Sequence, residues 1–422
     1  MATSTKNVSL EDLQNIVGEE YAREATPEDA VDGVDPSFVA EPGSIQETSE
    51  LMKFANSEDL AVAPRGGGTT MALGNPPREL DLILSTTRMD GIVEHVPGDQ
   101  VVRVQSGIQL KYLQEQLADS DQMLGVNPPE EEDGATVGGI VAANSSGPRR
   151  YRYGTVRDLI IGITVVLADG TVAKAGGKVV KNVAGYDLSK LFTGSLGTLG
   201  VIAECNFRLH PKPEAARTVA VEFPDTASVG EASQAILHAQ IVPSAVELYW
   251  SGQTHSLTVL IEGIPSGVEA QIQTVSHLLG GFGEVRTLSE EEAGSLRPSY
   301  LAGADGVTIK ISAAPAELPG VLDSTLGACS RAGIEPRVSG HAGTGVTYVG
   351  LSGEEGAEVV EELREIWVRR GGSVILREAS PAFKERVEAW GPLGSRLELT
   401  RRVKEKFDPR GILNPGRFVG GI

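Results

Sequence analysis

Apolar residues in the first part of the chain fall into short runs separated by glycine- and proline-containing turns. Phe38–Ala40 is short and extended, and Ser44–Glu47 has the spacing of a capping box at the start of a helix. Leu60–Ala63 is a continuous apolar run of the kind that forms a buried strand, and Leu80–Leu84 is a second one. Residues 35–84 therefore predict a βαβ-like unit.

Strand patterns continue as far as residue 209. Ile92–Val96 and Val101–Val104 are separated by Pro97-Gly98-Asp99 and predict a hairpin. Thr136–Asn144 contains almost only small or apolar residues, so we expect it to pass through a tightly packed place. The remaining predictions for this part are helices at Ile108–Leu117 and Leu188–Phe192 and strands at Asp158–Leu167 and Val201–Leu209.

Beyond Pro211-Lys212-Pro213 the pattern becomes a regular alternation of strands and helices. A first set contains strands at Val219–Phe223, Ala245–Tyr249 and Leu257–Ile261 and helices at Ser228–Ala239 and Val268–Leu279. A second set contains strands at Val307–Ile311, near Thr347–Val349 and at Val374–Arg377, with helices ending at Cys329 and spanning Gly356–Arg370. Two such sets predict an α+β domain with a duplicated, ferredoxin-like sheet and helices on one face. A charged helix at Ser395–Lys406 is expected near the end of the chain.

The composition excludes several classes of protein. The formal charge of −20 opposes nonspecific binding to nucleic acid or to anionic membranes. Cys205 and Cys329 are the two cysteines, without a C-x-x-C pair, which excludes a disulfide framework or a cysteine-ligated iron–sulfur cluster in this chain. The N-terminus lacks an apolar signal core, and no run approaches about 18 apolar residues. We expect a cytoplasmic protein with no direct membrane insertion; any association with a membrane would have to come through partner subunits.

The most informative local feature is Arg65-Gly66-Gly67-Gly68-Thr69-Thr70, directly after an apolar run. Three glycines let backbone N–H groups turn toward one point, which suits a phosphate or pyrophosphate, and Arg65 adds a planar cation. A plain strand-to-turn connection is the alternative for an isolated glycine triplet. Further glycine-rich stretches favour a binding site.

Neither common nucleotide fingerprint is present, since no G-x-G-x-x-G follows a strand and no G-x-x-x-x-G-K-[ST] occurs. Instead, a series of small-residue stretches follows the glycine loop. These are Ala135–Gly139, Asn144–Pro148, Arg152–Asp158, Lys181–Asp187 and Gly194–Ile202.

With these stretches the chain resembles the FAD-binding domain of the vanillyl-alcohol oxidase / p-cresol methylhydroxylase (PCMH) family over residues ~38 to 210, and Phe407–Arg417 resembles that family's C-terminus. Within the family, Trp390-Gly391-Pro392 and the closing Asn-Pro-Gly-Arg are most similar to FAD-binding subunits of bacterial glycolate oxidases. The resemblance implies a two-subdomain PCMH-type FAD-binding domain (38–212), an α+β cap or substrate domain (213–380) and a C-terminal segment (381–422) packing on the FAD domain. Residues 1–37 form an N-terminal segment.

The resemblance also implies roles for individual residues. Arg65, Gly66, Gly67, Gly68, Thr69 and Thr70 would cradle the FAD pyrophosphate, and Thr136, Gly138 and Gly139 would let a second backbone segment approach the cofactor. Asn144, Ser145 and Gly147 would line the diphosphate and flavin ring, and Asn414 the flavin's pyrimidine side. Val201 and Ile202 would contact the adenine end, with plain core positions as the alternative.

Two departures from the family pattern concern histidines. Many relatives carry a covalently attached histidine in the glycine loop; Thr69 and Thr70 stand there instead, so we expect non-covalent FAD. His341, in His341-Ala342-Gly343-Thr344-Gly345, resembles a His-x-Gly-x-Gly-x-x-His stretch of related 2-hydroxy-acid dehydrogenases, but Tyr348 replaces the second histidine. We therefore expect no metal site and name His341 as the candidate catalytic base or substrate contact, a glycine-rich turn being the alternative.

The implied function is that of an FAD-dependent oxidoreductase acting on CH–OH groups. FAD would accept a hydride from the α-carbon of a small 2-hydroxy acid such as glycolate, and pass electrons to a second flavin subunit and an iron–sulfur subunit. The alternatives are a flavin electron-relay or scaffold subunit and a free-standing FAD-dependent alcohol or sugar oxidase. The sequence does not choose a carboxylate-binding arginine among Arg297, Arg337 and Arg377, and the stretch Arg149–Arg152 could bind phosphate, a carboxylate or a partner.

Overall fold

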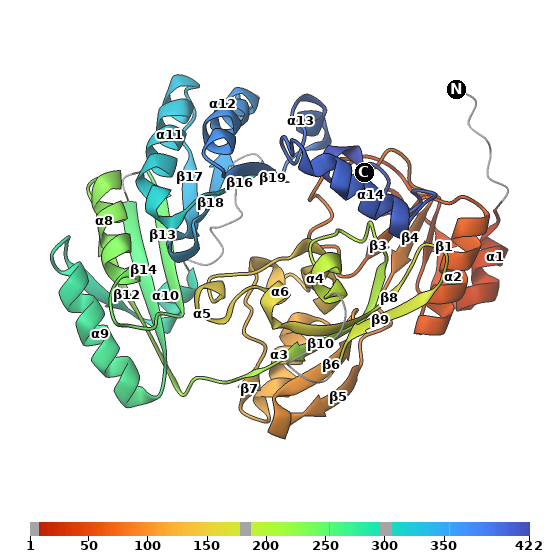
Figure 1. The fold of residues 1–422 in the computed structure, drawn as a ribbon, viewed down its shortest axis with the longest axis horizontal. Helices are drawn as coiled ribbons and strands as arrows, with labels where there is room; N and C mark the ends of the chain where they lie inside the picture. Colours follow the sequence, from red (N-terminus) through yellow and green to blue (C-terminus); the bar gives the residue numbers. More distant parts are fainter. Residues whose placement is uncertain (1–7, 178–186, 253, 296–305, 354) are drawn as a thin grey trace. The chain divides into compact units, whose positions relative to one another are not determined.

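The computed structural model describes residues 8–177, 187–252, 254–295, 306–353 and 355–422, which excludes most of the Lys181–Asp187 stretch and Arg297. The chain divides into two compact units (Figure 1). Unit 1 comprises the chain up to Ser145, Thr155–Pro211 and Leu393–Ile422, and unit 2 comprises Ser146–Gly154 and Lys212–Pro392. The expected domain limits differ from these units in assigning residues 146–154 to the first domain and 381–392 to the C-terminal segment.

The first sheet of unit 1 has four strands in the order β1-β2-β4-β3. Strands β2 and β3 run parallel to β4, and β1 runs antiparallel to β2. Ser44 caps helix α2 by accepting a hydrogen bond from the N–H of Glu47 at 3.1 Å, as the capping-box spacing predicts. The elements are α1 (Leu10–Val17), β1 (Ala22–Glu24), β2 (Phe38–Ala40), α2 (Ile45–Ser57), β3 (Val62–Arg65) and β4 (Leu82–Ser85).

The second sheet of unit 1 has five antiparallel strands in the order β5-β6-β10-β8-β9. The strand predicted to begin at Asp158 starts later, because Thr155 and Asp158 form a capping box that begins helix α6. The strands are β5 (Ile92–Val96), β6 (Val101–Gln105), β8 (Ile160–Val166), β9 (Val172–Gly176) and β10 (Val201–Arg208). The helices are α3 (Leu110–Ala118), α4 (Val137–Ala143), α6 (Val156–Leu159) and α7 (Leu188–Phe192).

Unit 2 is built on an eight-stranded antiparallel sheet in which one βαββαβ pattern occurs twice. The strand order is β15-β12-β14-β13-β17-β18-β16-β19, and the two repeats join where β13 pairs with β17. This is the duplicated ferredoxin-like sheet that the sequence predicts. The first repeat is β12 (Ala215–Glu222), α8 (Thr226–Leu237), β13 (Ala245–Ser251), β14 (Thr254–Gly263), α9 (Pro265–Leu279) and β15 (Val285–Leu288). The second is β16 (Val307–Ser312), α11 (Leu318–Arg331), β17 (Arg337–His341), β18 (Val346–Leu351), α12 (Gly356–Arg369) and β19 (Ser373–Glu378).

The two faces of the unit 2 sheet differ in chemistry. Apolar strand residues such as Leu248, Val259 and Ile309 share one core with the apolar sides of α8, α9, α11 and α12, which cover this face (Figure 1). Because strand side chains alternate between faces, the residues between them lie on the other side. There they are largely polar, yet buried or half-buried. We call this side the polar face; its residues include Glu247, Tyr249, Thr258, Glu262, Thr308, Lys310, Ser339, His341 and Tyr348.

The C-terminal tail returns to unit 1 through helix α14 (Arg396–Phe407). Phe407 packs edge-on against Phe192, with ring centroids 5.5 Å apart. In the described parts of the chain, no helix has the length and apolar character that crossing a membrane requires. The other short elements are α5 (Arg150–Tyr153), α10 (Glu290–Ser295), α13 (Pro381–Arg386), β7 (Gln122–Met123) and β11 (His210–Pro211).

Candidate functional site

A pocket in unit 1 lies beside the glycine loop that follows β3. Most of the cofactor-binding residues that the sequence suggests line it, namely Arg65, Gly66, Gly67, Gly68, Thr69, Thr70, Thr136, Gly138, Gly139, Val201, Ile202 and Asn414. Sequence reasoning did not single out the other lining residues, which are Pro64, Met71, Thr86, Ala142, Ala143, Leu196, Gly197, Gly200 and Arg417. Three of these residues lie in the Gly194–Ile202 stretch, and Arg417 belongs to the closing Asn-Pro-Gly-Arg. Both motifs were recognised in the sequence, so these four residues could have been predicted as part of the site.

The glycines allow two backbone segments to pack closely at this pocket. A Cβ atom at Gly67 would lie 2.2 Å from the carbonyl oxygen of Gly134, and one at Gly66 would lie 2.0 Å from Oγ1 of Thr136. Gly138 is equally constrained, because its Cβ would meet the Cβ of Ser106 at 2.6 Å. Gly66 and Gly67 therefore let the loop pack against the segment that leads into α4, and Gly138 lets α4 pack against Ser106. The cradle depends on this packing.

Three of the expected cofactor residues lie elsewhere. Asn144 ends α4 in a left-handed conformation (φ 49°), and Ser145 donates its hydroxyl to Oε2 of Glu130 at 2.8 Å. Neither is among the described residues that line the pocket. Gly147 belongs to the Ser146–Gly154 segment, which packs with unit 2. Their contact with FAD stays a prediction.

The closing motif folds into a turn that places Asn414 at the pocket. Nζ of Lys404 donates to the carbonyl oxygens of Thr198 and Leu413, each at 2.8 Å, and pairs with Oδ2 of Asp408 at 2.6 Å. The carboxylate of Asp408 in turn accepts the N–H groups of Ile412 and Leu413. Burial lowers the pKa of Lys404, an effect that the Asp408 carboxylate opposes. This buried ion pair therefore fixes the backbone that precedes Asn414.

Arg417 ties the same turn to the segment after the glycine loop. Its Nη2 donates to the carbonyl oxygens of Met71 and Leu73. Burial lowers the pKa of Arg417 to about 10. The C-terminus thus forms part of the pocket wall.

Lys404→Met is expected to lower the free energy of unfolding of unit 1 by about 3 kcal/mol, because it leaves the buried Asp408 carboxylate without its cation. The temperature at which bound flavin is released, followed by its fluorescence, measures the effect. Lys406→Met is the matched control, since Lys406 lies exposed on the same helix. Equal release temperatures for the two variants would contradict this role.

In unit 2, His341 ends β17 on the polar face, directly opposite Glu247 of β13. Its Nδ1 lies 2.9 Å and 3.0 Å from the two carboxylate oxygens of Glu247, and both side chains are buried. Tyr348 meets the imidazole edge-on, with ring centroids 5.7 Å apart. Sequence reasoning missed Glu247, although a glutamate inside an apolar strand run was a usable signal. The residues after His341 also form the expected turn, the 3₁₀ helix η8 (Ala342–Thr344) followed by Gly345 at φ 67°.

A half-buried lysine lies on the same face. Lys310 is the register partner of Tyr348, and its ammonium group makes no hydrogen bond or ion pair with the described residues. Burial, with the like charges of Arg150 and Arg377, lowers its pKa to about 8. Three cations with overlapping fields are suited to an anion.

The arginine-rich stretch is largely used inside unit 2. Nη2 of Arg149 pairs at 2.6 Å with the buried carboxylate of Glu262, on β14. Nη1 of Arg152 donates to the carbonyl oxygen of Glu262 and to the hydroxyl of Ser244. These contacts anchor residues 146–154 to the sheet.

Comparison with known proteins identifies the family. A model described as FAD binding domain matches residues 36–176, and a model of the C-terminal domain of FAD linked oxidases matches residues 212–270 and 387–418. A D-lactate dehydrogenase of Archaeoglobus fulgidus is 30% identical over 414 residues, covering 90% of this chain and 91% of the relative. The chain belongs to the FAD-linked oxidoreductases.

The chain is also 28% identical to the glycolate oxidase subunit GlcD of Bacillus subtilis, over 91% of its own length and 89% of the relative. A crystal structure of p-cresol methylhydroxylase with substrate bound superposes with a TM-score of 0.77 at 18% identity, covering 97% of this chain and 95% of that one. The PCMH-type fold that the sequence resembles is thereby confirmed, as is FAD as the cofactor. The protein is an FAD-linked oxidoreductase.

The pocket in unit 1 has the chemistry to hold this cofactor. Oδ1 of Asn414 is buried and accepts no hydrogen bond from the described residues, while its Nδ2 donates to the carbonyl oxygen of Leu196 at 2.6 Å. A buried acceptor of this kind suits an N–H group of a ligand. The glycine loop contributes backbone N–H groups. Gly139, at the start of α4, also lines the pocket, and because it has no side chain a ligand can approach the backbone there. These residues fit a flavin dinucleotide.

Proposed function

We propose that this FAD-linked oxidoreductase is the FAD-binding subunit of a dehydrogenase for a small 2-hydroxy acid, such as glycolate or D-lactate. The buried His341–Glu247 pair carries the proposal. When bound, FAD supplies the two-electron acceptor for oxidation of the substrate's α-carbon. The protein has to bind the acid and accept the hydroxyl proton.

His341 is the proposed proton acceptor. With Glu247 present as a carboxylate, the Nδ1–H group donates to it, and the neutral imidazole then carries its lone pair on Nε2. The carboxylate also stabilises the imidazolium that forms when Nε2 takes a proton. This arrangement is that of an oriented general base.

Lys310 is the proposed partner of the substrate carboxylate, and it takes the place of the arginines considered from the sequence. It lies two strands from His341 on the polar face, separated by β18. Of the arginines considered, Arg377 contributes to the same positive field, while Arg337 is exposed at the start of β17. An ammonium group beside two guanidinium groups attracts a carboxylate more strongly than it would alone.

We further propose that FAD is held without a covalent bond and that other subunits accept the electrons. None of the described residues that line the pocket is a histidine, cysteine or tyrosine, the usual points of attachment. Cys205 and Cys329 are both buried, and burial raises the pKa of both thiols. The two buried thiols leave any iron–sulfur cluster to a partner subunit, and the similarity to a protein named as a glycolate oxidase subunit supports the existence of partner subunits.

Anaerobic mixing of the purified FAD-loaded protein with glycolate, D-lactate and L-lactate tests the proposal. At least one acid should bleach the flavin absorbance promptly, with a rate that saturates with acid concentration. Above about pH 8 the apparent dissociation constant of the acid should rise about tenfold per pH unit, because Lys310 loses its proton there. No bleaching by any 2-hydroxy acid, under conditions where dithionite bleaches the flavin, would overturn the proposal.

A flavin relay or scaffold subunit is the second candidate. Tyr348 favours it, because this tyrosine packs against His341 where related dehydrogenases have a second histidine. In that case, only the complex with its partner subunits should turn over substrate. The mixing experiment, repeated with and without the partners, separates the two candidates.

A further inference from the structure

Arg65 is one of two arginines that line the FAD pocket, and hydrogen bonds hold its main chain. It is the last residue of β3, and its carbonyl oxygen accepts the N–H of Thr86 at 2.8 Å. Thr86 itself lines the pocket. The side chain of Arg65 is about one-fifth exposed. A long side chain at such a place needs a second support if its guanidinium is to keep one position.

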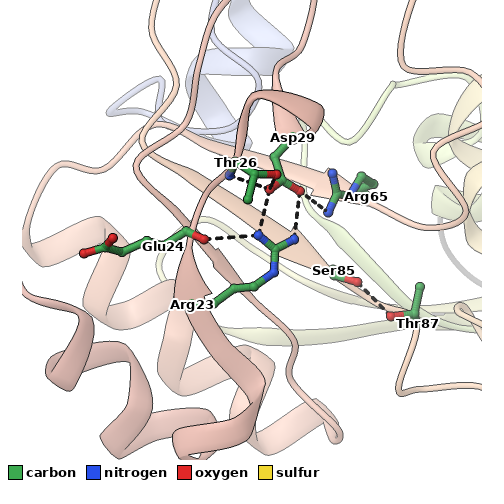
Figure 2. Close-up of polar contacts among 7 residues, drawn as sticks. All are labelled: Arg23, Glu24, Thr26, Asp29, Arg65, Ser85 and Thr87. Atoms are coloured by element: carbon green, nitrogen blue, oxygen red, sulfur yellow. Dashed lines mark hydrogen bonds and ion pairs between the residues drawn. The ribbon is translucent and has the colours of Figure 1, made fainter.

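That support comes from the N-terminal segment, for which no role was expected from the sequence. Asp29 lies in the 3₁₀ helix η2 (Pro27–Asp29), 36 positions before Arg65, and its side chain is 5% exposed. Its Oδ1 accepts a hydrogen bond from Nη2 of Arg65 at 3.0 Å (Figure 2). Because Asp29 is buried and fixed, it can hold the arginine in one orientation.

Four further hydrogen bonds, from Arg23 and Thr26, fix the Asp29 carboxylate. Arg23 donates with Nη1 to Oδ2 at 2.7 Å and with Nη2 to Oδ1 at 2.9 Å (Figure 2). The N–H and the hydroxyl of Thr26 both donate to Oδ2. These bonds, those of Arg23 above all, hold the pKa of Asp29 far below its usual range, so the carboxylate stays ionised.

The charges of this cluster suit an anion in the pocket. Arg23 neutralises Asp29 by a two-point pair, so the three side chains together keep one positive charge, on the pocket side. Nε and Nη1 of Arg65 make no hydrogen bond with any residue in the described ranges. They remain available as donors to a phosphate oxygen.

We propose that Asp29 is a positioning residue of the FAD site, which orients the Arg65 guanidinium for the cofactor's diphosphate. The proposal makes residues 22–29 part of the cofactor site. It rests on the placement of the diphosphate beside the glycine loop. Preorganisation of this kind tightens binding because less side-chain freedom is lost when the ligand arrives.

A double-mutant cycle on FAD affinity tests the proposal without any need for substrate. The dissociation constant of FAD from the refilled apoprotein is measured by flavin fluorescence for the unmodified protein, Asp29→Asn, Arg65→Met and the double variant. We expect each single change to weaken FAD about tenfold, or about 1.4 kcal/mol, and the double variant to be no weaker than Arg65→Met. A role limited to folding would instead lower the melting temperature of the apoprotein in both backgrounds and leave the affinity unchanged.

Two further variants make the cycle specific. Asp29→Glu keeps the charge but moves the carboxylate by one methylene group. It should weaken FAD binding as much as Asp29→Asn does. It also keeps the test available if Asp29→Asn does not fold. Glu47→Gln is the matched control, because Glu47 forms an ion pair with Arg88 and neither residue lines the pocket. Its FAD affinity should stay within about twofold of that of the unmodified protein.

The outcomes separate this inference from the function on which it rests. If Arg65→Met weakens FAD but Asp29→Asn and Asp29→Glu do not, or if the effects add, the positioning role is wrong and the diphosphate placement stands. If Arg65→Met leaves FAD affinity unchanged, the placement at the glycine loop fails, and the inference with it.

Discussion

His341→Asn is expected to slow reduction of the bound flavin by a 2-hydroxy acid about 10²- to 10⁴-fold, the usual contribution of a general base. Asparagine keeps a polar group of similar size but has no basic nitrogen, so the substrate hydroxyl would lose its proton acceptor. Rapid mixing under anaerobic conditions gives the limiting rate of bleaching and the apparent dissociation constant separately. The rate should fall while the dissociation constant changes little.

Two controls accompany this variant. Glu247→Gln keeps a hydrogen-bond acceptor for Nδ1 but removes the charge that stabilises the imidazolium, so its rate should fall as well, by a smaller factor. His238→Asn changes an exposed histidine of the same unit, which contacts the carbonyl oxygen of Gln234, and should react normally. A full bleaching rate for His341→Asn with normal FAD content would remove His341 from the mechanism.

Gly67→Val is expected to weaken FAD binding about ten- to a hundredfold, so that the purified protein loses most of its yellow cofactor. The added side chain cannot be accommodated, because even its Cβ would lie 2.2 Å from the carbonyl oxygen of Gly134, a backbone atom. Overpacking of this kind costs about 1–3 kcal/mol and would separate the two segments that form the cradle. The flavin-to-protein ratio and the dissociation constant of FAD measure the loss.

The chain offers a matched control and an internal reporter for this experiment. A Cβ atom at Gly98 would meet no heavy atom of the described residues within 4 Å, so Gly98→Val should retain FAD. All three tryptophans, Trp250, Trp367 and Trp390, lie in unit 2, so their fluorescence reports the folding of unit 2 alone. Stoichiometric FAD in Gly67→Val would show that the glycine loop does not form the cofactor site.

The glycine loop and the fold class could be predicted because both are written in local sequence. Glycine triplets, capping boxes and strand periodicity each depend on residues within a few positions of one another. Departures occurred where local signals competed, as at Asp158, where a capping box begins a helix inside a run expected to be a strand. At Thr136 the sequence and the structure agree: this residue was expected at the cofactor site, and it both caps α4 and lines the pocket.

The side-chain pairs of the FAD pocket and of the polar face could not be predicted in this way. His341 and Glu247 are 94 positions apart, and they meet because β13 pairs with β17 across the junction of the two repeats. The alternation of apolar and polar residues in a strand does not predict which strand will pair with it, or in which register. Arg149 and Glu262 likewise meet only because residues 146–154 fold back onto the unit 2 sheet.

The sequence by itself determined most of the elements, the α+β class and the repeated sheet, because these follow from backbone preferences and the spacing of apolar residues. It also marked the glycine-rich segments that we expect to bind FAD. Only the tertiary structure decided that Asp29 supports Arg65, that Lys404 fixes the turn before Asn414, and that Glu247 orients His341. Each of these contacts involves a buried carboxylate or ammonium group, and a buried charge is stable only beside a partner. Which partner it finds depends on strand pairing and chain reversal, which local sequence does not encode.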